Sequence, residues 1–279
     1  MIRRPPRSTP KPSSAASDVY KRQNLETIQV LNQGKVSTIM LNRPDMLNAV
    51  NEQLVWDLQK ATENVMNDDS VKVVILTGAG RGFSAGADLS ERKASWSGSK
   101  DALIRGYKPS FKNIINMPKP VIASVPGPAA GIGAALAMSC DLRVMSEDSY
   151  LLSVFSNIAL VPDGGLSWFL PKFMGYAKAY EHAIEAKKIL ASDCLKYGIA
   201  NKVVPSDQLE QITLDWANQL AKRSSQSLNH TKRLMRESLA MSYWDTFSNE
   251  AEIQNELTVS DQNREAVKAF LEKREPNFD

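Results

Sequence analysis

The sequence contains few of the residues that build metal centres, disulfide frameworks and cofactor loops. It has two cysteines, Cys140 and Cys194, and two histidines, His182 and His230. The cysteines form no C-x-x-C pair and the histidines lie in no ligand motif, so we expect neither disulfides nor a metal site. No G-x-x-x-x-G-K-[ST] loop is present, and the dinucleotide fingerprint G-x-G-x-x-G fails at Phe83. We therefore expect no metal and no nucleotide cofactor.

Long apolar runs and a strong charge imbalance are also missing. The uncharged run 121–140 is broken by two prolines and three glycines, so it predicts a strand, a turn and a buried helix. The net charge is +3, and six basic residues against one acidic residue lie within residues 1–23. The remaining chain has a slight negative excess, which gives no reason to expect nucleic-acid binding. We expect a protein that binds neither membrane nor nucleic acid and acts in the cytoplasm, with a mitochondrial or peroxisomal location left open.

Residues 1–23 are rich in proline, serine and arginine and have almost no apolar side chains to bury. This composition predicts disorder. A mitochondrial transit peptide is also rich in arginine and serine, but four prolines oppose the amphipathic helix that such peptides form. We interpret this segment as a non-native tail outside the fold.

Strand and helix patterns alternate from residue 24 to about residue 205. Helices are predicted from Leu47, after Asp88 and over 133–140. The predicted strands cover 29–41 (two strands), 71–78, 119–125 and 141–146. This order predicts an α/β core built from a repeated ββα unit.

Only helices are predicted beyond residue 205. Ser206 is expected to cap a helix whose apolar face includes Leu209 and Leu220. A second helix is expected over 226–241, and the last one from Asp261. The chain therefore divides into a core over 24–205 and a helical C-terminal region over 206–279.

Two glycine-rich loops each follow a predicted buried strand. They are "AGAD" (85–88) and "GPAAGIGAA" (127–135), and both place small residues where the backbone approaches something closely. Each is predicted to lead into a helix N-terminus, which favours negative charge. A tight strand-to-helix turn explains either loop alone, but the pair favours two N–H donors that converge on one oxygen, an oxyanion hole.

Four segments in this order resemble the enoyl-CoA hydratase/isomerase (crotonase) family. They are "NRPDMLNAV" (42–50), "GRGFSAGADL" (80–89), "KPVIASVPGPAAGIGAALAMSCD" (119–141) and "YGIANKVVP" (197–205). The resemblance extends over nearly the whole chain from residue 24. It implies a spiral of ββα units, a C-terminal region that assembles a homotrimer or hexamer, and an acyl-CoA thioester as substrate.

The resemblance also implies a binding site. A thioester enolate would accept hydrogen bonds from the backbone N–H groups of Ala87 and Ile132, and Ile132 is flanked by Gly131 and Gly133. Ile132 stands where many members have glycine, so its side chain narrows the slot for the thioester. The residues expected to contact coenzyme A are Arg43, Leu47, Arg81, Ala85, Asp88, Leu89, Ser90 and, from a neighbouring subunit, Lys273. Arg81 and Lys273 are explained equally well as solvated side chains.

The reaction depends on which acids are present. The resemblance implies hydration by two glutamates, but the matching positions hold Ala135 and Phe155, which transfer no proton. Asp163, in "VPDGG", resembles the single acid of the Δ3-Δ2-enoyl-CoA isomerases and of the ring-epoxide isomerase of phenylacetate degradation. A free aspartate titrates near pH 3.9, so a base here needs an apolar pocket. We expect Phe155, Leu160 and Trp168 to line it.

Several alternatives stay open. Pro–Asp–Gly–Gly also fits a turn or helix cap, which would give Asp163 a structural role only. Dehalogenases of this family use an aspartate here as a nucleophile and match Glu252 to Asn255, but they have a tryptophan at Phe155 and a histidine that this chain lacks. A hydratase-like, lyase or hydrolase activity, or a catalytically silent relative that binds acyl-CoA or RNA, is a further possibility. The resemblance favours an acyl-CoA isomerase with Asp163 as its acid/base and with loop 91–108 shaping the acyl pocket.

Overall fold

The computed structural model describes residues 22–91 and 94–278. The prediction that residues 1–23 form a non-native tail lies outside this range except for its last two positions. Strand β1 (Arg22–Asn24) pairs antiparallel with the next strand, so the predicted boundary after residue 23 falls inside a strand.

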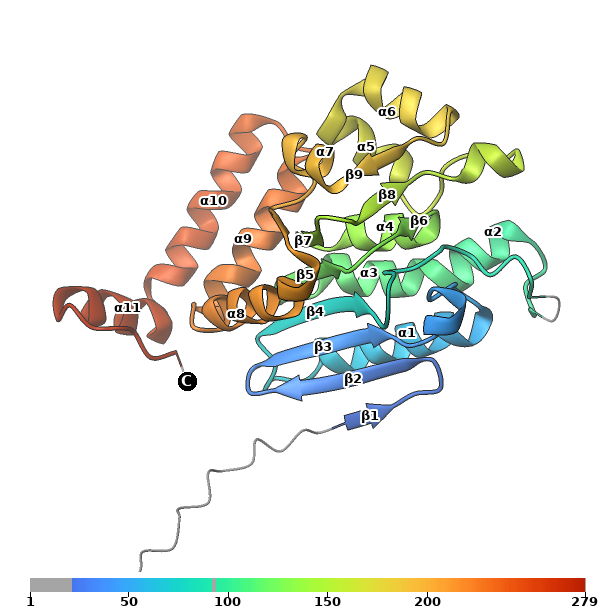
Figure 1. The fold of residues 1–279 in the computed structure, drawn as a ribbon. Coiled ribbons are helices and arrows are strands. Elements are labelled where there is room, and N and C mark those ends of the chain that lie inside the picture. The colour runs from blue at the N-terminus through green and yellow to red at the C-terminus, as the bar shows by residue number, and fades with distance from the viewer. Residues whose placement is uncertain (1–21, 92–93, 279) are drawn as a thin grey trace, which may run out of the picture.

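A seven-stranded sheet forms the centre of the described chain (Figure 1). Its order is β1, β2 (Ile28–Gln33), β3 (Val36–Leu41), β4 (Val73–Gly78), β5 (Val121–Val125), β7 (Leu142–Ser146) and β10 (Lys202–Val204). β1, β2 and β3 are antiparallel, and the pairs from β3 to β10 are parallel. A smaller sheet contains β6 (Ala129–Ala130), β8 (Tyr150–Leu152) and β9 (Lys188–Leu190).

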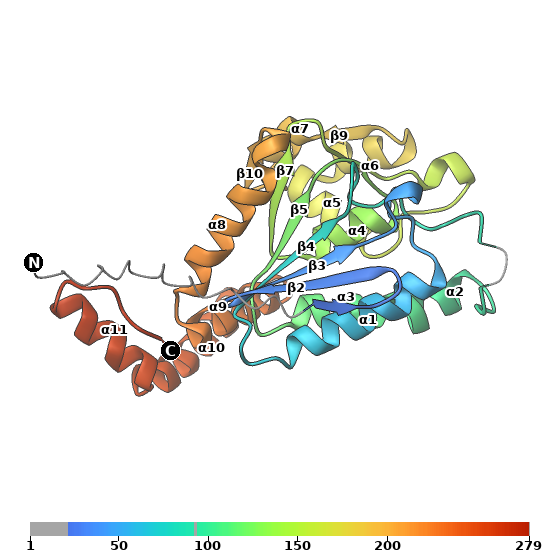
Figure 2. The same cartoon turned by 60° about the horizontal axis from the view of Figure 1, so that its bottom comes forward.

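Both faces of the large sheet are covered, as its nearly continuous apolar strands require. In β4, Val74 and Leu76 face a core beneath α1 (Glu52–Met66) and α3 (Lys108–Asn116). Val73 and Ile75 face the other side, where α8 (Leu209–Ala221) packs (Figure 2). Successive side chains of a strand point to opposite faces, so these four residues alternate between two cores.

The remaining elements of the core complete repeated ββα units, which confirms the predicted fold class. Strands β2 and β3 precede α1, β5 and β6 precede α4, and β7 and β8 precede α5. The helices and turns of the core not yet named are the 3₁₀ turn η1 (Pro44–Met46), α2 (Ser99–Asp101), the π-helix η2 (Ala102–Tyr107), α4 (Ile132–Ser139), the 3₁₀ turn η3 (Phe155–Ile158), α5 (Leu166–Met174), α6 (Tyr176–Ile184) and α7 (Ala191–Lys196).

Two helix predictions in the core were wrong. The helix predicted from Leu47 begins at Glu52, because Leu47 and Asn48 have left-handed φ angles of 49° and 55° and Asn51 caps the first turn. No helix follows Asp88 directly, and in the described chain the next one begins at Ser99.

The C-terminal region contains α8, α9 (Ser225–Ser238), α10 (Tyr243–Thr258) and α11 (Asp261–Leu271). The sequence prediction missed α10, which buries only Ile253 and so lacks a periodic apolar stripe. Ser206 lies in a short 3₁₀ turn and donates a hydrogen bond to Asp148 instead of capping α8. Among the residues that the structure describes, no helix has the length and apolar character needed to cross a bilayer.

Candidate active site

Two loops meet at the N-terminus of α4. Val50 N donates to Gly86 O (2.7 Å) and Asp88 N donates to Val50 O (3.0 Å), which leaves the Ala87 N–H on the opposite side of its strand-like segment. Gly86 has φ 96°, and a Cβ atom there would lie 2.9 Å from the carbonyl oxygen of Ala130. The two loops are therefore in direct backbone contact, which only glycine allows at residue 86.

The Ala87 and Ile132 N–H groups lie on these adjoining loops. Ile132 is the first residue of α4, and Gly131 before it has φ 53° and donates to Leu152 O at 2.9 Å. Within residues 22–91 and 94–278, neither Ala87 N–H nor Ile132 N–H has a hydrogen-bond acceptor. Free N–H groups at a helix N-terminus and on a neighbouring loop are the components of an oxyanion hole.

Asn48 connects the loops on either side of it by hydrogen bonds, and the sequence prediction did not include it. Its Nδ2 donates to Ala79 O (3.0 Å) and Gly82 O (2.9 Å), and its Oδ1 accepts from Arg43 N (2.9 Å). Its backbone oxygen accepts from Ser84 Oγ (2.9 Å), and the residue is fully buried. Asparagine tolerates the left-handed φ found here, which is the one signal that could have identified it.

The residues predicted to contact coenzyme A lie mostly on two loops, 43–47 and 81–90. Arg43 Nη2 and Asp88 Oδ2 form an ion pair at 3.0 Å, and Leu47 O accepts from Ala85 N at 2.9 Å. The hydroxyl of Ser90, followed by Arg43, lowers the pKa of Asp88 from its ordinary value. The carboxylate of Asp88 therefore ties the two loops together.

Three other predicted contact residues differ in position. Leu89 is 75% exposed beside Asp88, and Arg81 is exposed on the same loop. Lys273 follows α11, on the opposite side of the molecule from α4 in Figures 1 and 2. Within one chain Lys273 is therefore remote from the site.

Asp163 lies in a tight turn that packs against α4. Gly164 has φ 59°, and a Cβ atom there would lie 2.6 Å from both Ala135 Cβ and Ile132 Cδ1. The Asp163 carbonyl accepts from Leu166 N (3.0 Å) at the start of α5. The turn thus fills the space in front of Ala135, the position where the resemblance implies a glutamate in hydratases.

Asp163 lines a mostly apolar cavity of about 610 Å³. Its Oδ1 is buried, and the described chain offers it no hydrogen-bond partner. Burial raises the pKa of Asp163 from 3.8 to about 6. A carboxyl with this pKa can take up and release a proton near neutral pH.

The predicted lining of this cavity was partly wrong. Trp168 lines it, but Leu160 lines a separate groove and is 53% exposed, because the left-handed turn at Ala159 directs the chain outward. Phe155 is buried against Gly131, the residue before Ile132.

The lining also includes side chains of η2 and α3, which fits the expectation that loop 91–108 shapes the pocket. They are Leu103, Ile104, Tyr107, Lys108, Phe111 and Ile115. Burial raises the pKa of Tyr107 to about 12, and the nearby charge of Asp163 adds to this effect.

Other chemistry has little support among the described residues. Cys140 and Cys194 are buried, and burial raises the pKa of each thiol to about 12. No group of three or more His, Cys, Asp and Glu side chains in the described chain could hold a metal ion. Asp163 is the one carboxyl group in the described lining of the cavity.

Comparisons with known proteins agree with this arrangement. The sequence profile of the enoyl-CoA hydratase/isomerase family matches residues 32–279. The 1,2-epoxyphenylacetyl-CoA isomerase of Escherichia coli (strain K12) is 33% identical over 247 residues, which cover 87% of this chain and 94% of the relative. The short-chain-enoyl-CoA hydratase of Clostridium acetobutylicum is 31% identical over 253 residues, covering 90% and 96%.

Solved structures give the same result. The crystal structure of an enoyl-CoA hydratase from Bacillus anthracis superposes with a TM-score of 0.85 at 28% identity, covering 90% of this chain and 98% of the other. Relatives named for either activity therefore match most of this chain in sequence. The chain is an enzyme of the enoyl-CoA hydratase/isomerase family and has the crotonase fold.

Proposed function

We propose that the protein is an acyl-CoA isomerase that shifts a double bond or opens a ring epoxide through a thioester enolate. The observation that carries this proposal is the Asp163 carboxyl, which is unpaired within the described chain and is the one acid in the described cavity lining. Hydration catalysed by two carboxylates is disfavoured, because Ala135 and Phe155 occupy the positions where the resemblance implies the two glutamates.

In the proposed reaction the Asp163 carboxylate takes a proton from the carbon α or γ to the thioester. The electron pair of the broken C–H bond moves toward the thioester carbonyl and forms an enolate. The enolate oxygen accepts hydrogen bonds from the N–H groups of Ala87 and Ile132. The neutral Asp163 acid then returns the proton to a different carbon, so that no external base is consumed.

The coenzyme A moiety is proposed to lie along the loops that the Arg43–Asp88 ion pair joins. Leu47 and the segment 85–90 would form the two sides of this channel, and exposed Arg81 would meet a phosphate. Lys273 could contribute only from a neighbouring subunit, because α11 is remote from α4 within one chain.

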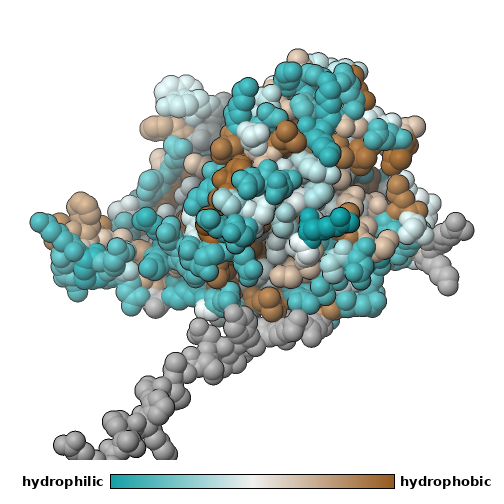
Figure 3. Space-filling view, in the orientation of Figure 1, coloured by the Kyte–Doolittle hydropathy of each residue, from teal (hydrophilic) through white to brown (hydrophobic). Residues whose placement is uncertain are grey.

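We also propose that the chain assembles as a homotrimer or hexamer. Tyr243, Trp244 and Phe247 on α10 are each more than half exposed, and α9 buries no residue completely. Such faces are commonly covered by further copies of the same chain. Brown apolar patches interrupt the polar surface of the face shown in Figure 3. Light scattering should find a trimer or a multiple of it, and a stable, active monomer would refute this proposal.

A turnover panel tests the proposed reaction. The purified protein is given a 3-enoyl-CoA, a 2-enoyl-CoA in water and ring-1,2-epoxyphenylacetyl-CoA, and the products are separated by mass and retention time. The proposal expects products of unchanged mass from the first or the third substrate. A gain of one water on the 2-enoyl-CoA as the dominant reaction would instead favour a hydratase, the activity named for several relatives.

A further inference from the structure

Arg236, on α9, lines the same cavity as Asp163. Its Nη2 donates to the carbonyl oxygen of Ser139, the last residue of α4, at 2.9 Å. The Asp163 turn instead packs against α4 at Ile132 and Ala135. Ser139 lies four residues beyond Ala135, which is about 6 Å along the helix axis. Arg236 therefore contacts α4 nearer its C-terminus than the Asp163 turn does.

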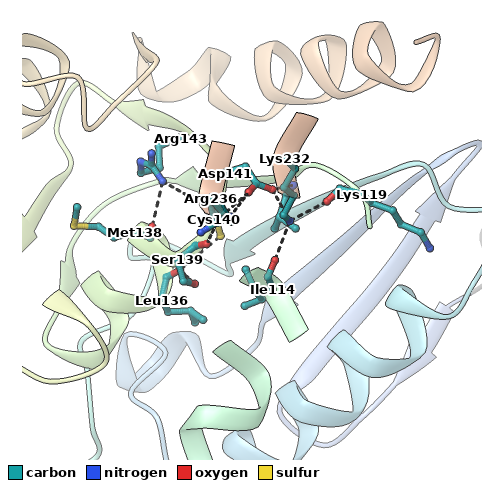
Figure 4. A network of polar contacts seen from close by, with 11 residues as sticks. Ile114, Lys119, Leu136, Met138, Ser139, Cys140, Asp141, Arg143, Lys232 and Arg236 are labelled. Carbon is teal, nitrogen blue, oxygen red and sulfur yellow. Dashed lines mark hydrogen bonds and ion pairs between the residues drawn. The ribbon is translucent and has the colours of Figure 1, made fainter. Parts of the chain in front are cut away.

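Arg236 belongs to a network in which one carboxylate forms ion pairs with two cationic side chains (Figure 4). Asp141 Oδ1 accepts from Arg236 Nη2 at 2.7 Å, and Asp141 Oδ2 pairs with Lys232 Nζ at 2.8 Å. Lys232 also donates to the carbonyl oxygens of Ile114 and Lys119. One carboxylate against two cations leaves a surplus positive charge beside the cavity.

The guanidinium of Arg236 has unused hydrogen-bonding capacity. Its Nε and Nη2 bond to Asp141 and Ser139, whereas Nη1 has no acceptor among residues 22–91 and 94–278. The side chain is 24% exposed, and it lines both this cavity and a neighbouring groove. The bonds to Asp141 and Ser139 fix the guanidinium in place, which lowers the entropy cost of binding a ligand.

The rest of the lining shows which ligand suits this donor. Most lining side chains are apolar, so the body of an acyl group fits them, while Lys108 is the second cation and Asp163 the one acid in the described lining. A hydrocarbon terminus would leave the Arg236 donor desolvated and unpaired, which costs free energy. A carboxylate would form a charge-assisted hydrogen bond with it.

We propose that Arg236 selects acyl-CoA substrates whose acyl group ends in a carboxylate. This inference rests on the proposed acyl-CoA function of the cavity and adds the class of acyl group. Asp163 would act near the thioester, and Arg236 would hold the far end of the acyl group.

The test compares pairs of 3-enoyl-CoA substrates of equal length, one ending in a carboxylate and one in a methyl group. In Arg236→Met, the ratio of kcat/KM for the carboxylate over the methyl substrate should fall about 10-fold or more, as expected for loss of a charged hydrogen bond. Arg236→Lys should restore part of the ratio. Arg233→Met is the matched control, because Arg233 is exposed on the same helix and pairs with His230 outside the cavity lining.

A binding measurement separates this inference from the proposed reaction. Calorimetry with adipoyl-CoA against hexanoyl-CoA, and suberoyl-CoA against octanoyl-CoA, needs no turnover. A preference for the carboxylate member that Arg236→Met removes, in a protein with normal melting behaviour, supports the inference even if no isomerase activity is found. Equal binding of both members by the wild type and by Arg236→Met overturns the inference and leaves the proposed function intact. If no thioester binds, both are overturned.

Discussion

The two walls of the proposed active site, the loops that carry Ala87 and Ile132 and the cavity that Asp163 lines, are built by opposite means. On the wall that carries Ala87 and Ile132, the loops are joined by backbone hydrogen bonds and by the buried side chain of Asn48. On the wall that carries Asp163, the carboxyl Oδ1 lacks a partner in the described chain, and apolar side chains surround it.

This difference matches what each wall would do in the proposed reaction. Two N–H donors stabilise an oxyanion only if they are held in place before the charge develops, so their supporting loops need many hydrogen bonds. A carboxyl works as a base near neutral pH only if its ordinary hydrogen bonds and solvent are withheld. The first wall holds the two N–H donors in a fixed position, and the second raises the pKa of Asp163.

The strongest test of this comparison is Asp163→Asn. Turnover should fall by about 10²–10⁴-fold, because the substituted amide cannot accept the proton. Acyl-CoA affinity should change little, since the wall with Ala87 and Ile132 is untouched. Steady-state kinetics on the substrate that the wild type accepts, with calorimetric binding of a saturated acyl-CoA, measures both quantities.

Near-normal turnover of a folded Asp163→Asn protein would contradict the one-base mechanism. It would leave Asp163 as a turn residue, and the catalytic group would then be sought on loop 91–108. Loss of acyl-CoA binding together with turnover would mean that the two walls are not independent.

Gly164→Ala should destabilise the turn that carries Asp163. A Cβ atom would lie 2.6 Å from Ala135 Cβ and Ile132 Cδ1, so overpacking of about 1–3 kcal/mol adds to the cost of φ 59°. Gly34→Ala is the matched control, because Gly34 has φ 57° but nothing within 4 Å of its Cβ position. Denaturant unfolding of both variants isolates the packing cost, and equal losses would show that the Asp163 turn does not press on α4.

Asn48→Ala tests the hydrogen-bonded wall. It removes the partners of Ala79 O, Gly82 O and Arg43 N in a fully buried place. We expect a loss of about 2–3 kcal/mol in the free energy of unfolding, since unsatisfied buried groups cost about 1–3 kcal/mol each and some will be rehydrated. Turnover should fall with the pKa of Asp163 unchanged, and a shifted pH–rate profile would contradict the separation of the two walls.

The sequence predicted the hydrogen-bonded wall better than the acid wall. Its strands and glycine loops have local signals, namely continuous apolar runs and small residues at close backbone contacts. Much of the lining around Asp163 comes from η2 and α3, which approach it only in the folded chain. The left-handed turn at Ala159 could not be predicted either, because alanine rarely adopts a positive φ angle. Asn48 was missed for a similar reason, because its partners Ala79 and Gly82 are distant in sequence.

The smallest expected effect is on stability, and its size depends on pH. The folded protein raises the pKa of Asp163 from 3.8 to about 6, so the folded state binds a proton more tightly than the unfolded state. The stability that the protonated carboxyl contributes is complete below about pH 4 and is lost as the pH rises through about 6. Asp163→Asn imitates the protonated form, so it should melt slightly higher than the wild type at pH 7.5, with the difference vanishing near pH 4.

The same ionisation should govern activity in the opposite direction. Wild-type kcat/KM should fall as the pH drops below about 6, because the base becomes protonated. The other titratable groups of the lining are Tyr107, Lys108 and Arg236, and the pKa of Tyr107, at about 12, is far above this range. Thermal melts of the wild type, Asp163→Asn and the exposed control Asp207→Asn from pH 4 to 8 check the stability effect. A gain in stability of Asp163→Asn at pH 4 that equals its gain at pH 7.5 would show that the carboxyl is not desolvated. In that case the acid wall would not differ from the hydrogen-bonded wall in the way its geometry indicates.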